Sequence, residues 1–184
     1  MNLPRYIHSF FELVKLQKIE IYNEFSLQHE LGLYLRNHLD NSFKIQFERN
    51  VKFFDITENL IKKELDIVIY NPTTNERYAI ELKFPKNGQH PETMFNFAKD
   101  IKFMEQMKEH GFSHTYAISY AEDKLFYSGS NIAGIYGYFR SNNPLHGEIT
   151  KPTGKRNEQF YINGSYTIQW QTLKGSLKYY LLEI

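Results

Sequence analysis

Two apolar runs separated by turn-forming residues stand out in the middle of the chain. The first, residues 64–70, carries β-branched, aromatic or leucine side chains at most positions, which is typical of a strand buried on both faces. The second, residues 78–83, is equally apolar except for Glu81 and Lys83. An Asn-Pro-Thr-Thr-Asn-Glu stretch joins the runs and is rich in turn formers. The pattern predicts a β-hairpin with two charged groups in its second strand.

Three other segments repeat apolar residues at helical spacing. They cover residues 4–15, 23–39 and 92–110. Gly111 follows the last of these and is a suitable helix stop. We therefore expect one helix before the first strand, a second helix directly preceding the strand region, and a third after the hairpin.

The remaining pattern around the hairpin indicates more strands. Apolar and polar residues alternate from Phe43, as in a half-buried strand that is expected to continue to Phe54. A short apolar run, residues 116–120, follows the third predicted helix. Strand, helix and strand in succession favour a parallel crossover. The expected fold class is therefore α/β, a mixed β-sheet flanked by helices, with its core in residues 24–120.

The C-terminal third, residues 121–184, is strand-rich. Asn163-Gly164 is expected to form a two-residue hairpin turn, because this dipeptide accepts positive φ angles. Lys174-Gly175 is expected to reverse the chain again. This extension either continues the sheet or builds a dimer interface or substrate platform, and we treat residues 1–184 as a single domain.

Composition limits the possible classes of protein. The 184 residues are 41% hydrophobic and 16% aromatic, which is enough for a sizeable core. The absence of cysteine excludes disulfides and thiolate metal sites. No apolar run approaches the roughly 20 residues of a membrane span, so we expect a soluble cytoplasmic protein without membrane contact. A net charge of +1 argues against a uniformly basic surface but leaves room for a local basic cleft.

Charged residues in the predicted hairpin suggest a cation site. Side chains alternate along a strand, so Glu81 and Lys83 project to the same face, and the hairpin brings Asp66 opposite or diagonal to them. Carboxylate oxygens suit Mg²⁺, which usually keeps several waters and substrate phosphates. A lysine beside the metal can orient the attacking water and hold a phosphate oxygen.

Asp66, followed after a hairpin by Glu81-Leu82-Lys83, resembles the PD-(D/E)XK nuclease superfamily and its restriction-endonuclease-like fold. Leu65 stands where the proline of the family name would be. Members also carry a glutamate on a helix before the first strand, and Glu30 matches that role. The resemblance covers about residues 24–120.

The resemblance implies a site and an activity. Asp66, Glu81 and the backbone carbonyl of Leu82 would bind Mg²⁺, for which Mn²⁺ can substitute, and Glu30 would be an additional ligand. Lys83 would position the attacking water and the scissile phosphate. The implied function is a metal-dependent endonuclease that hydrolyses phosphodiester bonds, with DNA as the expected partner and a homodimer as a possible assembly.

Seven further residues are candidates to touch the substrate, although each is equally explained as solvated surface. They lie in the loop after the hairpin, on the third helix and in a basic loop: Lys86, Gln89, Lys99, Lys102, Lys151, Lys155 and Arg156. Two alternatives stay open for the whole interpretation. The charged triad can be a structural ion-pair network, or the fold can serve as a catalytically inactive nucleic-acid-binding or subunit-interaction module.

Overall fold

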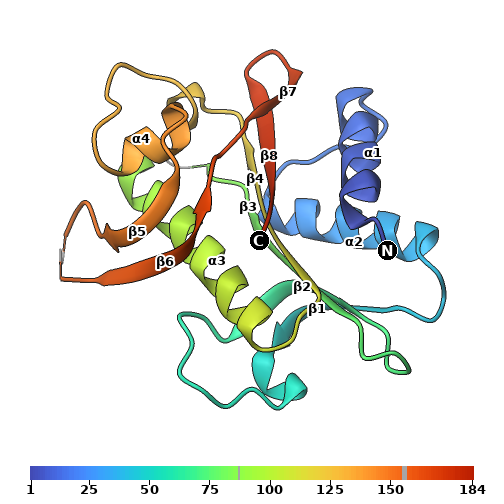
Figure 1. Cartoon of the computed structure of the whole chain (residues 1–184). Coiled ribbons are helices and arrows are strands. Elements are labelled where there is room, and N and C mark those ends of the chain that lie inside the picture. Colours follow the sequence, from blue (N-terminus) through green and yellow to red (C-terminus); the bar gives the residue numbers. More distant parts are fainter. Residues whose placement is uncertain (87, 155–156) are drawn as a thin grey trace.

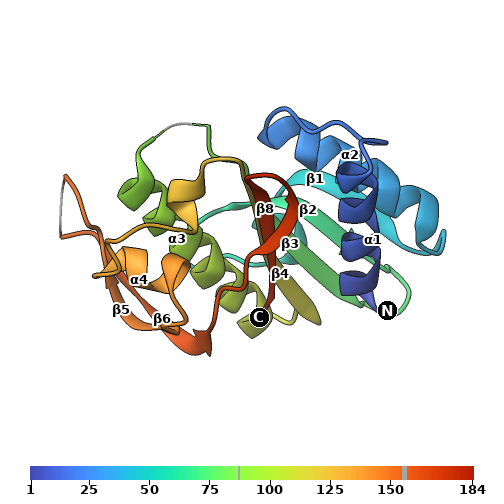
Figure 2. The same ribbon diagram turned by 90° about the horizontal axis from the view of Figure 1, so that it is seen from above.

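A six-stranded mixed β-sheet lies between two layers of helix in the computed structural model, which describes residues 1–86, 88–154 and 157–184 (Figures 1 and 2). The helices are α1 (Leu3–Lys15), α2 (Glu24–His38), α3 (His90–Glu109) and α4 (Ile135–Arg140), with short 3-10 turns η1 (Val51–Phe54) and η2 (Lys124–Phe126). The strands are β1 (Lys44–Asn50), β2 (Glu64–Tyr70), β3 (Arg77–Lys83), β4 (His114–Ala121), β5 (Leu145–Thr150), β6 (Gln159–Tyr166), β7 (Gln171–Lys174) and β8 (Leu177–Glu183).

The large sheet has the strand order β1-β2-β3-β4-β8-β7. β3 and β4 run parallel and are joined through α3, whereas all other neighbouring strands are antiparallel. The predicted mixed sheet flanked by helices, the hairpin over residues 64–83 and the parallel crossover are therefore confirmed. β8 pairs with β4 and β7 with β8, so the C-terminal segment does extend the sheet.

Helices α1 and α2 cover one face of the sheet (Figure 2). α2 begins with a capping box, in which the Asn23 side chain accepts from the backbone of Ser26 and the Ser26 hydroxyl accepts from the backbone of Asn23. Further along, Gly32 lets the helix approach β1 closely, because a Cβ there would lie 2.2 Å from the ring of Phe47. The first turns of α2 lie at the ends of β2 and β3, where Gln28 bonds the Asp66 carbonyl and Glu24 accepts the Phe84 N–H.

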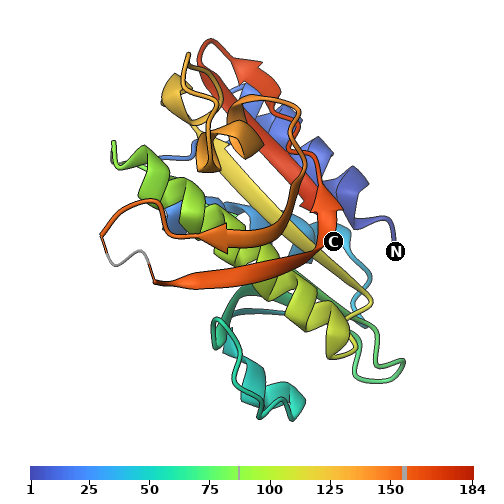
Figure 3. The ribbon, with the colours of Figure 1, turned by 60° about the vertical axis from the view of Figure 1, so that its left-hand side comes forward.

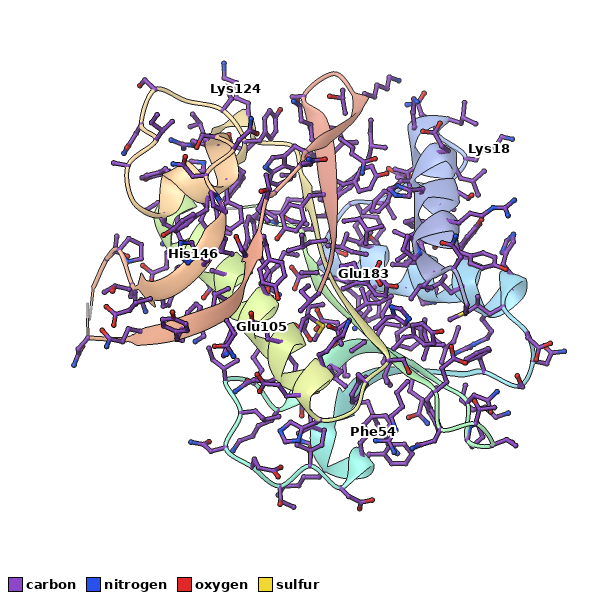
Figure 4. The ribbon with its side chains drawn as sticks, viewed as in Figure 1. Lys18, Phe54, Glu105, Lys124, His146 and Glu183 are labelled. Carbon is purple, nitrogen blue, oxygen red and sulfur yellow. The ribbon has the colours of Figure 1, made fainter. Side chains whose placement is uncertain are left out.

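Helix α3 covers the opposite face and is itself crossed by the β5–β6 ribbon (Figure 3). The buried Glu105 carboxylate on α3 faces this ribbon and accepts the backbone N–H groups of Asn163 and Gly164 at 3.0 and 2.6 Å, and the Tyr166 hydroxyl at 3.1 Å (Figure 4). The predicted turn at Asn163-Gly164 is wrong. Both residues lie within β6, where its register with β5 shifts, and Glu105 accepts their N–H groups.

Two further boundaries can be compared with the pattern. The first strand ends at Asn50 rather than Phe54, since Val51–Phe54 wind into a 3-10 turn that Asp55 closes with a φ of 62°. The predicted reversal at Lys174-Gly175 is confirmed, and Gly175 adopts the left-handed conformation that the turn requires, with a φ of 57°.

Candidate active site

The candidate site forms where β2 and β3 separate. Their ladder includes the pair Ile67 and Ile80, and beyond this pair side chains replace the backbone hydrogen bonds. The Asp66 carboxylate accepts the backbone N–H of Leu82 at 2.7 Å. The Glu81 carboxylate accepts the backbone N–H of Asp66 at 3.3 Å. The two carboxylates predicted to meet are therefore brought together, and they also hold the diverging strands.

Lys83 joins the same end of the sheet. Its ammonium group donates to the Leu82 carbonyl at 2.8 Å and lies 3.6 Å from the Asp100 carboxylate on α3. It also lies 3.4 Å from the Glu24 carboxylate on α2, whose second oxygen accepts the backbone N–H of Phe84 at 2.8 Å. Helices from both layers thus fix the position of Lys83.

A second lysine, Lys62, adds a charge that the motif did not predict. Its ammonium group forms a close ion pair with Glu81 and lies 3.0 Å from Asp100. The Glu81 side chain is 0% exposed and that of Asp100 is 5% exposed, whereas that of Lys62 is 27% exposed. Glu81 is consequently buried beneath its neighbours and is not open to solvent.

A cavity of about 170 Å³ opens on the α2 side of this cluster. Gln28 crosses it, donating to the Glu48 carboxylate at 2.6 Å and to the Asp66 carbonyl at 2.7 Å. Glu48 has a left-handed backbone, with a φ of 47°, inside strand β1. Such strain in a residue other than glycine is typical of functional sites. The cavity is lined by Glu24, Phe25, Gln28, Glu48, Asp66 and Leu82.

Burial and mutual repulsion shift the acid–base behaviour of the cluster. Desolvation raises the pKa of Asp66 to about 6, although Lys83 and Lys62 partly oppose this. Desolvation, followed by the charges of Asp66 and Asp100, raises the pKa of Glu81 well above its ordinary value. Burial alone would lower the pKa of Lys62, but the carboxylates of Asp100 and Glu81 outweigh it and raise that pKa.

Glu30 does not reach the cluster. Its carboxylate is 37% exposed and lies 3.7 Å from His29. Two positions turn a helix by about 200°, so Gln28, which faces the site, and Glu30 project to nearly opposite sides of α2. The structure therefore does not bring Glu30, the expected helix ligand, to the cluster. The α2 carboxylate at the site is Glu24, in the first turn of the helix.

Each described lysine that was expected to contact substrate is paired with a carboxylate, and Gln89 is an exposed residue that precedes α3. Lys155 and Arg156 lie outside the described residues. A phosphate contact at any of these lysines must therefore compete with an existing ion pair. The pairs are Lys86 with Glu122 at 3.2 Å, Lys99 with Glu158 at 2.8 Å, Lys102 with Glu105 at 3.0 Å and Lys151 with Glu92 at 3.0 Å.

One residue of the charged cluster, Asp100, was not predicted from the sequence although the sequence contains a signal for it. Asp100 lies three positions after Phe97 and four before Met104, so it falls on the buried stripe of α3. A carboxylate on an apolar stripe needs a buried cationic partner. Lys62 carried no comparable signal, because the irregular segment before β2 has no periodicity from which its direction can be predicted.

The donor chemistry of the cluster fits a divalent cation. Asp66, Glu81 and the Leu82 carbonyl offer the hard oxygen ligands that Mg²⁺ prefers. Five carboxylates face two ammonium groups here, because Glu24, Glu48 and Asp100 add to the first two. Within the described residues, however, no three acidic or histidine side chains already stand together as a metal-binding group. Cation binding therefore requires side chains to rearrange.

Comparison with known proteins identifies no relative of this chain. No family model, no curated protein and no solved structure matches the chain. Within the part of the chain that the structure describes, no helix is both long enough and apolar enough to cross a membrane. The functional argument therefore depends on the geometry of the cluster.

Proposed function

We propose that the chain is a Mg²⁺-dependent endonuclease of the PD-(D/E)XK type that hydrolyses phosphodiester bonds in DNA. The meeting of Asp66, Glu81 and Lys83 where β2 and β3 separate carries this proposal. The element order around them supports it, because a helix and a strand precede the acidic hairpin, and a helix and a parallel strand follow it. The resemblance in the sequence implies the same context.

Each residue has a role in this proposal. Asp66, Glu81 and the Leu82 carbonyl would hold Mg²⁺, with Glu24 rather than Glu30 as the carboxylate from the helix. When bound, the metal lowers the pKa of a water molecule and offsets negative charge on the phosphate. Lys83 donates hydrogen bonds to the attacking water and to a phosphate oxygen, since its ammonium lies next to the Leu82 carbonyl.

The test compares variants that preserve the local hydrogen bonds. Asp66→Asn keeps an acceptor for the Leu82 N–H, and Lys83→Met keeps the length of the side chain. Both should reduce cleavage of supercoiled and linear DNA in Mg²⁺ by at least about 100-fold while the protein stays folded. Lys15→Met is the control, because Lys15 on α1 is also a lysine paired with a glutamate but is not among the candidate substrate contacts, and it should keep its activity. Undiminished cleavage by both site variants would contradict the proposal.

One observation favours a second candidate, a catalytically inactive nucleic-acid-binding or subunit-interaction module. The fully buried Glu81 is paired with Lys62, an arrangement that a structural ion cluster would also produce. Calorimetric titration with Mg²⁺ and Mn²⁺ separates the two. An enzyme takes up metal and cuts, whereas the module binds DNA without doing either.

A further inference from the structure

Lys62 lies on the solvent side of the carboxylate cluster and is joined to its most buried member. We propose that Lys62 is a tethered counter-ion, which occupies Glu81 in the metal-free protein and leaves it when a divalent cation binds. This inference rests on the proposed function, since it assigns the step that opens the same site. The ammonium is thereby a competitor of the metal, not one of the groups that act on the substrate.

The placement of Lys62 carries the argument. Its ammonium pairs with Glu81 and lies 3.0 Å from Asp100, and these two carboxylates are almost without solvent exposure. Buried carboxylates without a partner are strongly destabilising, so the metal-free fold needs a positive charge at this point. Lys62 supplies that charge.

A dication and this ammonium cannot share Glu81. Both need its carboxylate oxygens, one of which already accepts the Asp66 N–H. Two positive charges a few ångströms apart in a buried setting repel each other strongly. The dication brings the larger charge to the carboxylates, so its binding expels Lys62. Lys83 also lies 3.6 Å from Asp100, a carboxylate outside the proposed set of metal ligands, and can remain beside it.

The backbone around Lys62 allows this exchange without unfolding. The preceding residue, Ile61, donates its N–H to the Gln106 side chain at 3.0 Å, and the following residue, Lys63, accepts the Val51 N–H at 2.9 Å. Both neighbours are therefore anchored, while the four-carbon stem of Lys62 is flexible. A rotamer change of one side chain is enough to carry its ammonium into solvent.

The first experiment uses the unaltered protein and an amine-acetylating reagent, with labelling of each lysine followed by mass spectrometry. Lys99 is the internal control, because its side chain is 26% exposed against 27% for Lys62 and it too is held by a carboxylate. Saturating Mn²⁺ should raise the labelling rate of Lys62 at least about fivefold relative to that of Lys99. An unchanged or slower rate at Lys62, in protein shown by calorimetry to hold Mn²⁺, would overturn the inference.

The second experiment measures Mn²⁺ affinity by calorimetry. Lys62→Gln should bind Mn²⁺ at least about tenfold more tightly than the unaltered protein, whereas Lys62→Arg, which keeps the charge, should not bind more tightly. If Lys62 has only a structural role, Lys62→Gln should bind Mn²⁺ more weakly than the unaltered protein or equally well, and either result would overturn the inference.

The outcomes separate the inference from the function beneath it. If the unaltered protein takes up Mn²⁺ and cuts DNA, but neither the labelling nor the affinity depends on Lys62, the nuclease proposal stands and the counter-ion exchange is wrong. If neither the unaltered protein nor Lys62→Gln takes up Mn²⁺, both proposals are wrong.

Discussion

At the Asp66 carboxylate, two physical effects oppose each other. Burial disfavours its charged form, while Lys83 and Lys62 favour it, and burial prevails because the pKa is raised to about 6. Relative to its protonated form, the ionised Asp66 carboxylate is thus less favourable in the folded protein than in the unfolded chain. The same carboxylate accepts the Leu82 N–H, so the residue costs stability through its charge and adds stability through its hydrogen bond.

This opposition predicts a pH dependence that Asp66→Asn should remove. Below pH 3.8, the ordinary pKa of the group, Asp66 is protonated in both the folded and the unfolded chain, and its ionisation does not change the free energy of unfolding. Between that pH and about 6 the unfolded chain loses the proton first, so rising pH favours unfolding, and above about 6 the full cost is present. Relative to the unaltered protein, Asp66→Asn should therefore be more stable at pH 7 than at pH 4, by on the order of 1–3 kcal/mol. Urea unfolding at both pH values measures this, and an equal difference at the two would contradict it.

Strand alternation was enough to predict that Asp66, Glu81 and Lys83 meet, because all three lie in one hairpin. The other charges come from separate elements, and their contacts depend on how those elements pack. Glu24 and Glu30 both lie on α2; Glu30 projects away from the side of Gln28, and the direction in which the helix crosses the sheet decides which of its turns reaches the site. No local pattern contains that direction.

At the scale of elements, α3 organises the C-terminal half of the molecule. Its Glu105 fixes β6, and this explains why Asn163-Gly164 forms no turn. Helix and strand boundaries that depend on local periodicity could be predicted within a few residues, as for α1 and α2. The β6 prediction was wrong because a carboxylate distant in the sequence decided the conformation of the dipeptide.

Removing the Glu105 carboxylate should weaken the attachment of the β5–β6 ribbon to α3. Glu105→Ala leaves the backbone N–H groups of Asn163 and Gly164 and the Tyr166 hydroxyl without their acceptor, and it separates Lys102 from its partner. We expect a loss of about 3 kcal/mol in the free energy of unfolding. Asn96→Ala is the control on the same helix, because Asn96 is exposed, and it should change stability by no more than about 0.5 kcal/mol. Similar values in chemical denaturation for both variants would show that Glu105 does not fix β6.

For the whole molecule, the strand order places the end of the chain in the interior of the sheet. β8 lies between β4 and β7, and its Tyr179 and Tyr180 are buried on opposite faces. Phe11 of α1 stacks on Tyr179 with ring centroids 3.8 Å apart. The first helix and the last hairpin therefore stabilise the sheet that carries the site, even though the resemblance to nucleases covers only about residues 24–120.

A chain ending at Tyr120 tests this dependence. It retains Asp66, Glu81 and Lys83, yet it loses every partner on the open side of β4. We expect no cooperative thermal transition by circular dichroism and poor dispersion of amide signals, because the core on both faces is left uncovered. The full chain under the same conditions is the reference, and a sharp transition in the shortened chain would show that the sheet folds without β8.

The left-handed backbone at Glu48 has a consequence for any attempt to strengthen this protein. Glycine adopts that conformation freely, so selection for heat resistance alone should favour glycine at this position. Such a change would also empty one wall of the cavity and release one of the two acceptors that hold Gln28. Higher stability and an intact wall of the proposed site would thus compete at a single position.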